Sequence, residues 1–313
     1  VIGAEFYAMQ RLAGIIPRKN LPAGIELSRE QVRQLCTNVL DTLVALHRVD
    51  PHTAGLEGIG KGAGYAQRQI EGWSKRYRDA RTWNVPRGDR IMRWLAANLP
   101  AQERICVTHN DFRFDNVVLD PADPTRVIGV LDWELAHVGD PMRDLACFRG
   151  RHPIENMGDV PALFLHYEKA MGVPLDYDAL AFQTVAFLCE AYYGPLFGMH
   201  DTGRGGDWVE SVFQVAVIAR RAMEALAEII GLQLDTLTLP EQPEATPYED
   251  LALGKLIADL ERLPESEALQ GWQRNILVSV PHYLRNRGHY RQWCEQADIA
   301  ETATLTGKQI YNL

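Results

Sequence analysis

The sequence predicts a mostly helical α+β protein in which a short β-rich segment interrupts a series of amphipathic helices. Apolar residues recur at helical spacing between residues 32 and 46, which indicates a helix with one buried face. The period changes between residues 104 and 132, where short β-branched and apolar runs alternate with turn residues. Helical spacing returns after Met142. The length of 313 residues is enough for one large domain or two ordinary domains.

The N-terminal part predicts an extended segment followed by helices. Residues 5–12 are aromatic and apolar, which indicates a strand or an extended linker. The first helix has a capping box, with Ser28 as N-cap and Gln31 three residues later, and it ends near His47. Loops are expected at 17–24 and 51–64, and further helices at 65–78 and 88–99.

The β-rich segment predicts three short strands, and the rest of the chain predicts helices. The strands are expected at 105–107, 117–119 and 127–131, with an Asp- and Pro-containing turn at 120–124. Helices are expected at 160–171, 177–193 and 207–230, a Pro-rich linker at 240–247, and short helices at 248–263, 266–285 and 288–297.

The bulk composition argues against several classes of protein. The formal net charge of −9 disfavours a nucleic-acid-binding role, because such domains carry a basic stripe. No run of about 18 apolar residues indicates a membrane span, and no secretory signal pattern stands at the N-terminus. Scattered cysteines without a Cys-x-x-Cys pair predict reduced core residues in a cytoplasmic protein. They are Cys36, Cys106, Cys147, Cys189 and Cys294.

Three polar residues around the β-rich segment have the spacing of a phosphotransfer site. Asp111 follows the first predicted strand, Asn116 stands five residues later, and Asp132 ends the third apolar run. Phosphoryl transfer from ATP to a hydroxyl needs a carboxylate that orients and deprotonates the alcohol, and oxygen ligands that hold magnesium. Protein kinases use a His-Arg-Asp-Leu-x-x-x-Asn loop and a later Asp-Phe-Gly for these tasks, and His109 keeps the His-x-Asp order.

Other interpretations of these residues are weaker. Asp and Asn usually serve turns and caps, and any one of the three taken alone fits that description. Their combined kinase spacing and flanking strands favour phosphotransfer. A metal hydrolase is disfavoured, because no His pair falls in helical register and Asn116 would have no role. Such a hydrolase would use His109, Asp111, Asp132, His137 and Asp140.

Residues 55–62 nearly spell a Walker A loop, Gly-x-x-x-x-Gly-Lys-[Ser/Thr]. The Ser or Thr that binds magnesium is missing, and a predicted helix precedes the segment where a strand is required. The better interpretation is a flexible loop near the entrance for substrate.

The segment 107–145 resembles the aminoglycoside phosphotransferase and choline kinase family. The family motifs are H-[GN]-D-x-x-x-x-N, then [IL]-D-[WF]-[ED], then G-D-P-x-x-D-L-A, and they match residues 109–116, 131–134 and 139–146. The most similar subgroup is the kinase-like domain associated with acyl-CoA dehydrogenases, whose loop reads H-G-D-F-R-x-D-N. The similarity extends weakly from residue 5 to about residue 230.

This resemblance implies the C-terminal lobe of a protein-kinase-like fold with a small β-hairpin, plus a C-terminal helical extension. Asp111 would be the catalytic base, and Asn116 and Asp132 would be magnesium ligands. His109 would brace the loop. Arg113 would stabilise the transferring charge or meet an anionic part of the substrate, and a solvated loop arginine is the alternative.

Further roles are implied at the start and end of the match. Asp144 would hydrogen-bond the catalytic-loop backbone. The hinge strand would contact the nucleotide through Met9, Gln10 and Leu12. The implied organisation is a hinge strand at 1–12, a kinase-like C-terminal lobe at 13–239, a linker at 240–247 and a helical extension at 248–313.

The helices after residue 189 usually build the acceptor pocket in this fold, although aromatic residues at helical spacing are more often core. The candidates are Glu190, Tyr192, Tyr193, Phe197, Trp208 and Phe213. Three acidic residues would suit an amine-bearing acceptor, or would form a solvated loop. They are Asp201, Asp207 and Glu210.

The chain departs from the family pattern at its start. Family members have an N-terminal lobe with a phosphate-covering loop, a strand Lys that grips the α- and β-phosphates and a helix Glu that pairs with it. Here no Lys precedes Lys19, and Gly3 stands alone. We therefore expect a fragment or part of a longer protein, rather than a degenerate relative, since no initiator Met is present.

The expected function is magnesium-dependent transfer of the γ-phosphate of ATP to a hydroxyl of a small molecule. The acceptor is aminoglycoside-like, hydroxyacyl or another alcohol, because acceptor pockets in this fold are shaped by variable helices. The alternative is a non-catalytic module that binds a ligand or a partner through the same cleft.

Overall fold

The computed structural model describes most of the chain. The described residues are 10–17, 21–22, 24–80, 86–101, 104–155, 157–201, 208–236, 238–241, 247–264 and 268–309, and at some helix ends, including 192–201 and 208–215, only the backbone is described. The chain divides into two compact units, residues 1–197 with 215–233 and residues 198–214 with 234–313. Across the described ranges, no helix combines the length and hydropathy that a bilayer span requires.

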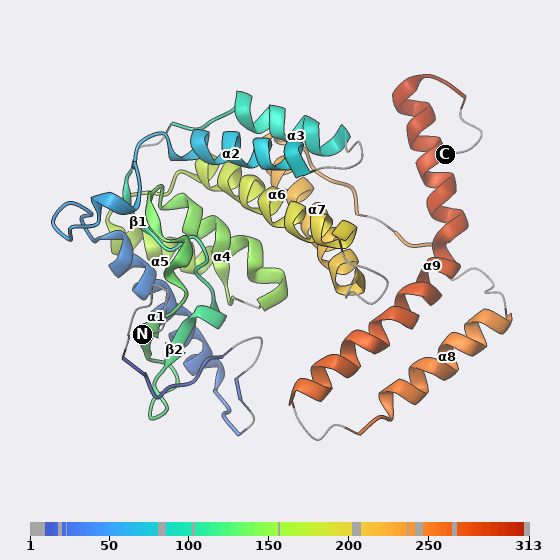
Figure 1. Cartoon of the computed structure of the whole chain (residues 1–313), viewed down its shortest axis with the longest axis horizontal. Helices are drawn as coiled ribbons and strands as arrows, with labels where there is room; N and C mark the ends of the chain where they lie inside the picture. The colour runs from blue at the N-terminus through green and yellow to red at the C-terminus, as the bar shows by residue number, and fades with distance from the viewer. Residues whose placement is uncertain are drawn as a thin grey trace, which may run out of the picture. The chain divides into compact units, whose positions relative to one another are not determined.

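The first unit is mostly helical and carries two small antiparallel sheets (Figure 1). The strands are β1 (Cys106–Thr108), β2 (Val117–Leu119), β3 (Val127–Val130) and β4 (His137–Gly139). The helices, of which α6 and α7 extend into the second unit, are α1 (Arg29–His47), α2 (Tyr65–Ala80), α3 (Pro86–Ala97), α4 (Met142–Glu155), α5 (Val160–Met171), α6 (Tyr177–Asp201) and α7 (Trp208–Ile229). Short 3₁₀ turns are η1 (Glu57–Ile59), η2 (Phe114–Asn116) and η3 (Trp133–Leu135). The predicted mostly helical α+β class is confirmed.

The strand pairing brings the predicted site segments together. β1 pairs with β4, with Val107 opposite Val138, and β2 pairs with β3, with Val117 opposite Val130. The three expected strands correspond to β1, β2 and β3 within one residue. No strand pattern marks β4, because three residues ending in glycine are too short to show alternation.

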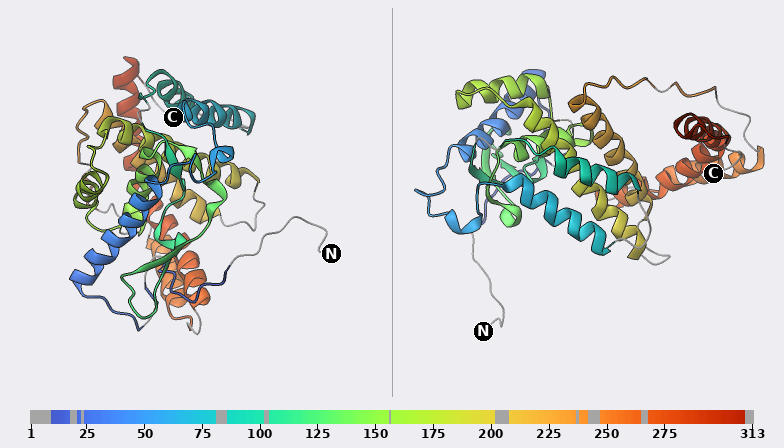
Figure 2. Two further views of the ribbon diagram at one scale, coloured as in Figure 1. Left: turned by 90° about the vertical axis from the view of Figure 1, so that its left-hand side faces the viewer. Right: turned by 90° about the horizontal axis from the view of Figure 1, so that it is seen from above.

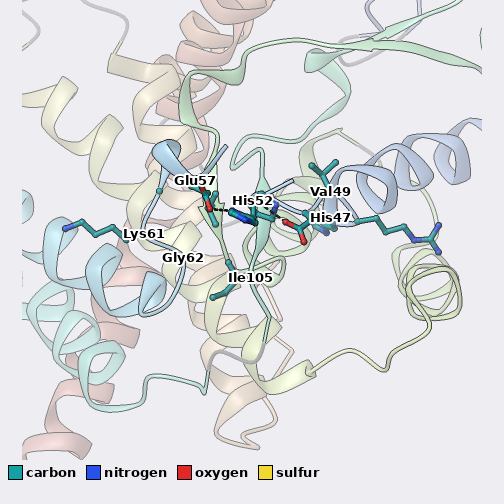
Figure 3. Close-up of a pocket in the computed structure, with 12 residues that line it drawn as sticks. His47, Val49, His52, Glu57, Lys61, Gly62 and Ile105 are labelled. Carbon is teal, nitrogen blue, oxygen red and sulfur yellow. Dashed lines mark hydrogen bonds and ion pairs between the residues drawn. The ribbon is translucent and has the colours of Figure 1, made fainter. Parts of the chain in front are cut away.

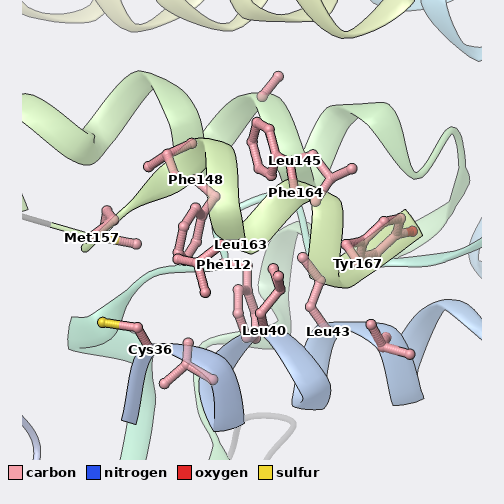
Figure 4. Close-up of a cluster of buried hydrophobic side chains, with 14 of the residues drawn as sticks. Cys36, Leu40, Leu43, Phe112, Leu145, Phe148, Met157, Leu163, Phe164 and Tyr167 are labelled. Atoms are coloured by element: carbon pink, nitrogen blue, oxygen red, sulfur yellow. The ribbon is translucent and has the colours of Figure 1, made fainter. Parts of the chain in front are cut away.

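Helix α1 begins and packs as its sequence predicts. The Ser28 N–H donates to Gln31 Oε1 at 2.9 Å, and the Gln31 N–H donates to Ser28 Oγ at 3.3 Å, which completes the capping box. Figure 4 shows Leu40 and Leu43 of α1 in one buried cluster with Phe112. Since Phe112 follows Asp111 directly and is fully buried, the loop that carries the predicted base is fastened to this core.

A second cluster of buried side chains joins α2, α3, α6 and α7. Figures 1 and 2 agree that α2 and α3 run side by side. The members of this cluster include Ile70, Tyr77, Leu95, Phe182, Val185 and Ala222. The cluster supports α6, which packs close to α4 through Gly150 and Phe187.

The start of the described chain runs along β2. Ile15 forms a two-way backbone bridge with Leu119, with N···O distances of 2.9 and 2.8 Å. A Cβ at Gly14 would lie 2.2 Å from Val118 Cγ1, so only glycine permits this approach. The predicted hinge strand at 1–12 falls mostly on residues 1–9, which lie outside the described residues, and 10–14 adopt no regular structure.

The second unit contains α8 (Pro247–Glu261) and α9 (Ala268–Thr306), which pack side by side. The expectation of separate helices at 266–285 and 288–297 is wrong, because α9 continues through Gly288. Arg285 and His289, on either side of Gly288, bind the Asp250 carboxylate of α8 at 3.1 and 3.0 Å. These contacts join the two helices on both sides of Gly288, the helical residue type that is least favourable after proline.

The cysteines follow the prediction with one exception. Cys36, Cys106, Cys147 and Cys189 are buried and free. Cys294 is free but exposed on α9, so its assignment to a core is wrong. In a hairpin of two helices, much of each helix faces solvent, and apolar residue type alone does not fix the buried face.

We expect Leu40→Ala to lower the free energy of unfolding by roughly 2–5 kcal/mol, because it opens a cavity in the cluster that α1 shares with Phe112. Leu40 is fully buried. Leu165 on α5 is 61% exposed and provides the matched control, with an expected change within about 0.5 kcal/mol. Urea denaturation followed by circular dichroism measures both. Equal losses in the two variants would contradict the described packing of α1.

Candidate active site

The carboxylate of Asp144, in the first turn of α4, fixes the loop after β1. It accepts hydrogen bonds from the backbone N–H groups of His109 at 2.8 Å and Asn110 at 2.6 Å. His47 Nε2 of α1 lies 3.0 Å from the same carboxylate, and His47 Nδ1 lies 2.7 Å from the hydroxyl of Tyr167. The expectation that Asp144 hydrogen-bonds the catalytic-loop backbone is confirmed. Three segments distant in sequence therefore meet at one buried charge.

Two buried carboxyl groups at this place have pKa values that are shifted in opposite directions. Burial disfavours the charged form of Asp144, but the hydrogen bond and charge of His47 and the two backbone donors outweigh it and hold the pKa of Asp144 below 3.8. At Asp140, burial dominates and raises the pKa above 3.8, although the N–H of Met142 and the amide of Gln183 oppose the shift. The surroundings of Asp144 thus favour its ionised form more than those of Asp140 do.

Asn110 turns the loop and bonds it to the segment after Asp132. Its φ of 65° lies in the left-handed region, which Asn tolerates better than most residues. The side-chain Nδ2 lies 2.8 Å from the carbonyl oxygen of Leu135 and 2.7 Å from His137 Nδ1. The Tyr65 hydroxyl donates to Asn110 Oδ1 at 3.2 Å. These hydrogen bonds stabilise Asn at position 110, where the family motif allows Gly or Asn.

His109 joins the two halves of the predicted site. Its Nε2 donates to the carbonyl oxygen of Leu131 at 2.8 Å, and its Nδ1 accepts the Asp111 N–H at 3.2 Å, which assigns the neutral tautomer with hydrogen on Nε2. The fully buried ring lies 4.8 Å from the Trp133 ring. His109 therefore fixes the backbone on both sides of the predicted metal-binding segment.

Asp111 and Asn116 are bonded directly. The Asn116 Nδ2 donates to the Asp111 carbonyl oxygen at 2.8 Å and to Asp111 Oδ2 at 3.1 Å. Asp111 Oδ1 accepts from Arg151 of α4. The sequence analysis missed Arg151, because no spacing rule relates a residue on a following helix to a loop 40 positions earlier. An arginine on the helix that follows the G-D-P-x-x-D segment is the only signal that could have suggested it.

The backbone directly before Asp132 is hydrogen-bonded to the backbone of Asn116. The Leu131 N–H donates to the Asn116 carbonyl oxygen at 2.8 Å, which continues the ladder of β2 and β3 past Val130. Asp132 adopts φ 65° and ψ 57° and is exposed to solvent. A non-glycine residue in this conformation costs about 1–2 kcal/mol. The fixed backbone of Leu131 maintains this strained turn.

The remaining predicted site residues are Arg113 and the three residues of the expected hinge segment. Arg113 forms an ion pair with Asp115, and its side chain is only 24% exposed, so the solvated-loop alternative does not describe it. Leu12 lies over Gly129 of β3, where a Cβ would approach Leu12 Cδ1 to 2.5 Å, and Gln10 is exposed. Met9 lies outside the described residues.

Glu190 is the one described member of the expected acceptor-pocket group whose surroundings are fully defined. It is buried and forms an ion pair with Arg143 of α4. Burial raises the pKa of Glu190, and the charge of Arg143 opposes that shift. The core-packing alternative therefore describes Glu190. No side chain is described at Tyr192, Tyr193, Phe197, Trp208 or Phe213.

A cavity of about 510 Å³ lies apart from these residues (Figure 3). It is bounded by the end of α1, the loop that contains η1, and the edge of β4, and its lining includes His47, His52, Glu57, Lys61 and Val138. None of the predicted site residues lines it. The near-Walker loop follows α1 and contains η1, so the element directly before it is the helix expected from the sequence and not the strand that a Walker A loop requires.

Comparison with known proteins identifies the family. The profile of the phosphotransferase enzyme family, APH, matches residues 1–182, which is more than half of the chain. The chain therefore belongs to the phosphotransferase enzyme family. This result agrees with the residues that Asp144 and His109 bring together after β1.

The relatives include the subgroup that the sequence resembles. Acyl-CoA dehydrogenase family member 11 from Rattus norvegicus is 32% identical over an alignment of 323 residues, and the match covers 94% of this chain and 39% of that protein. Acyl-CoA dehydrogenase family member 10 from Mus musculus is 38% identical over 146 residues, covering 47% of this chain and 13% of that protein. The chain thus spans a minor part of the length of these relatives.

A solved structure shares the fold. The crystal structure of a protein from Ralstonia eutropha JMP134, provisionally named an aminoglycoside phosphotransferase, matches with a TM-score of 0.57 and 25% sequence identity. The match covers 74% of this chain and 73% of that chain. The α+β architecture with its small two-stranded sheets is therefore similar to that of aminoglycoside phosphotransferases.

We expect Asp144→Asn to lower the free energy of unfolding at neutral pH by about 1–3 kcal/mol, because the loop loses a charged acceptor. The pKa of Asp144 is lower in the folded state, so its contribution is complete above 3.8 and is lost as the pH falls through the folded pKa. Urea unfolding between neutral pH and about pH 3 should show a smaller acid-induced loss in the variant than in the wild type.

Asp140→Asn is the matched control, since it changes another buried aspartate of the same segment. The pKa of Asp140 is raised, so its ionisation disfavours the folded state as the pH rises through that pKa. The stability of this variant relative to wild type should therefore improve from acid to neutral pH. The same direction of pH dependence in both variants would contradict the opposite pKa shifts of Asp144 and Asp140.

Proposed function

We propose that the protein transfers the γ-phosphoryl group of ATP to a hydroxyl group of a small molecule. The observation that carries this proposal is the direct bonding of Asp111 to Asn116, next to Asp132 on a fixed backbone. Kinase sites use the same three residue types, one to orient the alcohol and two for metal ions. Membership of the phosphotransferase enzyme family supports the reaction class.

The residues fit a magnesium ion. The Asn116 amide nitrogen is engaged by Asp111, which leaves the amide oxygen Oδ1 as a ligand, and the exposed Asp132 supplies a carboxylate. Carboxylate and amide oxygens are the hard ligands that Mg²⁺ prefers. Asn116 and Asp132 would hold the ion, which when bound neutralises charge on the phosphates.

Asp111 is the residue of this chain that would react directly with the acceptor. In the proposed reaction its carboxylate accepts a hydrogen bond from the acceptor hydroxyl and takes the proton as the new O–P bond forms. The bond between the γ-phosphorus and the bridging oxygen breaks in line, and ADP leaves. His109 and Asp144 keep the loop in place, so that no reorganisation is needed during transfer. Arg113 is proposed to stabilise charge on the transferring group.

The hinge segment and the acceptor complete the proposal. Met9, Gln10 and Leu12 are proposed to contact the nucleotide, as the family resemblance implies. The acceptor is an aminoglycoside-like, hydroxyacyl or other alcohol. Two relatives are named acyl-CoA dehydrogenase family members, which favours hydroxyacyl compounds as the first to screen. The division into hinge strand, lobe, linker and helical extension, and the cytoplasmic location, stay predictions.

We expect Asp111→Asn to reduce turnover of MgATP by roughly 10²–10⁴-fold, the usual contribution of a general base. Affinity for MgATP should change little, because the proposed ligands are Asn116 and Asp132. Phosphate release and nucleotide binding by calorimetry measure the two quantities. Asp123→Asn in the turn between β2 and β3 is the control and should keep full activity. Undiminished turnover in Asp111→Asn would remove the residue from the mechanism, and no turnover in any protein would favour the non-catalytic binding module.

We expect Asp132→Asn to raise the magnesium concentration needed for half-maximal turnover at least about tenfold, since a neutral amide replaces a charged ligand. Glu134→Gln, an exposed change two residues away in η3, should leave that concentration unchanged. Magnesium titration at saturating ATP measures both. An equal shift in the two variants would indicate a general surface-charge effect and would count against Asp132 as a ligand.

A further inference from the structure

Arg151 contacts the predicted base from a different element of the fold. It lies near the end of α4, and its guanidinium forms an ion pair with Asp111 Oδ1. The two side chains are 24% and 19% exposed, so the pair is mostly shielded from water. Attraction between charges is stronger at such a place than on an open surface. This ion pair therefore restrains Asp111 more than a surface salt bridge would.

The Asp111 carboxylate is held at both oxygens. Arg151 holds Oδ1, and Asn116 Nδ2 lies 3.1 Å from Oδ2. Each carboxylate oxygen has two lone pairs, so one on each remains for an acceptor hydroxyl. Two donors from separate elements fix the rotation of the carboxylate about its last bond. Such fixation matters because a small displacement of a reacting group costs a large part of the rate.

An aromatic ring keeps the guanidinium of Arg151 in place. The Arg151 guanidinium carbon lies 5.5 Å from the centre of the Phe187 ring of α6, and that of Arg143 lies 5.2 Å from the same ring. Arg143 is in turn paired with Glu190. A cation within about 6 Å of an aromatic ring centre is attracted to the face of that ring. Phe187 therefore restricts Arg151 to the face that reaches Asp111.

Gly150 permits this arrangement. A Cβ at Gly150 would lie 3.0 Å from Phe187 Cδ1 and 3.1 Å from Phe187 Cε1. A side chain at position 150 would force the ring to move away from α4 by a few tenths of an ångström. In the sequence Arg-Gly-Arg at 149–151, Gly150 thus leaves room for the Phe187 ring, and Arg151 supplies the cation that the ring orients.

We propose that Arg151 is a positioning residue that holds the Asp111 carboxylate in its reactive orientation. The inference rests on the proposed phosphotransfer function. Arg151 acts through Asp111 and makes no bond to the transferred phosphoryl group.

Arg149 offers a matched control on the same helix. It also forms an ion pair with a carboxylate, that of Glu228 on α7, and its side chain is 24% exposed, the same as that of Arg151. Replacing either arginine by methionine therefore removes one equally shielded cation from α4, and only Arg151→Met releases Asp111.

The experiment measures phosphate release from MgATP, with water as the acceptor, for wild type, Arg151→Met, Arg151→Lys and Arg149→Met. We expect Arg151→Met to lower kcat by roughly 10–100-fold with KM for MgATP within about threefold, because orientation and not nucleotide binding is lost. Arg151→Lys should recover part of kcat, and added guanidinium ion at non-denaturing concentration should partly rescue Arg151→Met. Arg149→Met should keep the wild-type kcat.

A double variant separates this inference from the proposed function. In an Asp111→Asn background, Arg151→Met should cost no further activity, since two residues that act as a unit are not additive. Melting temperatures of wild type, Asp111→Asn, Arg151→Met and the double variant should show the same coupling, and this measurement does not depend on turnover. Full activity of Arg151→Met alongside inactive Asp111→Asn would overturn the role of Arg151 only. Undiminished activity of Asp111→Asn would overturn the proposed function itself.

Discussion

One buried carboxylate, that of Asp144, determines whether the site exists at all. It accepts two backbone hydrogen bonds from the loop after β1, and His47 lies within hydrogen-bonding distance of the oxygen that also accepts the His109 N–H. Loop backbone without such a partner would leave N–H groups unsatisfied in the interior. Because the pKa of Asp144 is held low, the anion persists at every physiological pH. The left-handed turn at Asn110 and the contact of His109 with Leu131 both start from this anchored backbone.

The sequence was sufficient for the parts of the site that are local. The capping box of α1, the strands around Asp111 and the hairpin that joins Asn116 to Asp132 follow from periodicity, turn residues and spacing. Each of these features involves residues within about one hairpin length of each other. The family resemblance then supplied the role of Asp144, which no periodicity indicates, and the hydrogen bonds confirm it.

The features that sequence reasoning missed depend on packing between distant elements. Arg151 reaches Asp111 only because α4 turns back beside the loop and Phe187 of α6 supports the guanidinium. Glu190 was a candidate for an acceptor pocket with core packing as the favoured alternative, and only the structure supplies its buried partner, Arg143. The break expected between residues 285 and 288 is absent, and Arg285 and His289 on either side of Gly288 both bind Asp250 of the neighbouring helix. Tertiary interactions of this kind leave no periodic trace in the sequence.

The burial of Phe112 has a consequence for how the loop moves. Phe112 is in van der Waals contact with the interior formed by α1, α4 and α5, and it follows Asp111 in the chain without a spacer. We therefore expect the loop to open only together with the helices that pack around Phe112. Its amide protons should exchange with deuterium as slowly as those of the most protected helices, since opening requires the cooperative unit as a whole. The fraction of molecules with an intact loop would then depend on global stability. Destabilising changes far from the cleft would lower that fraction without altering the chemistry of the molecules that remain folded.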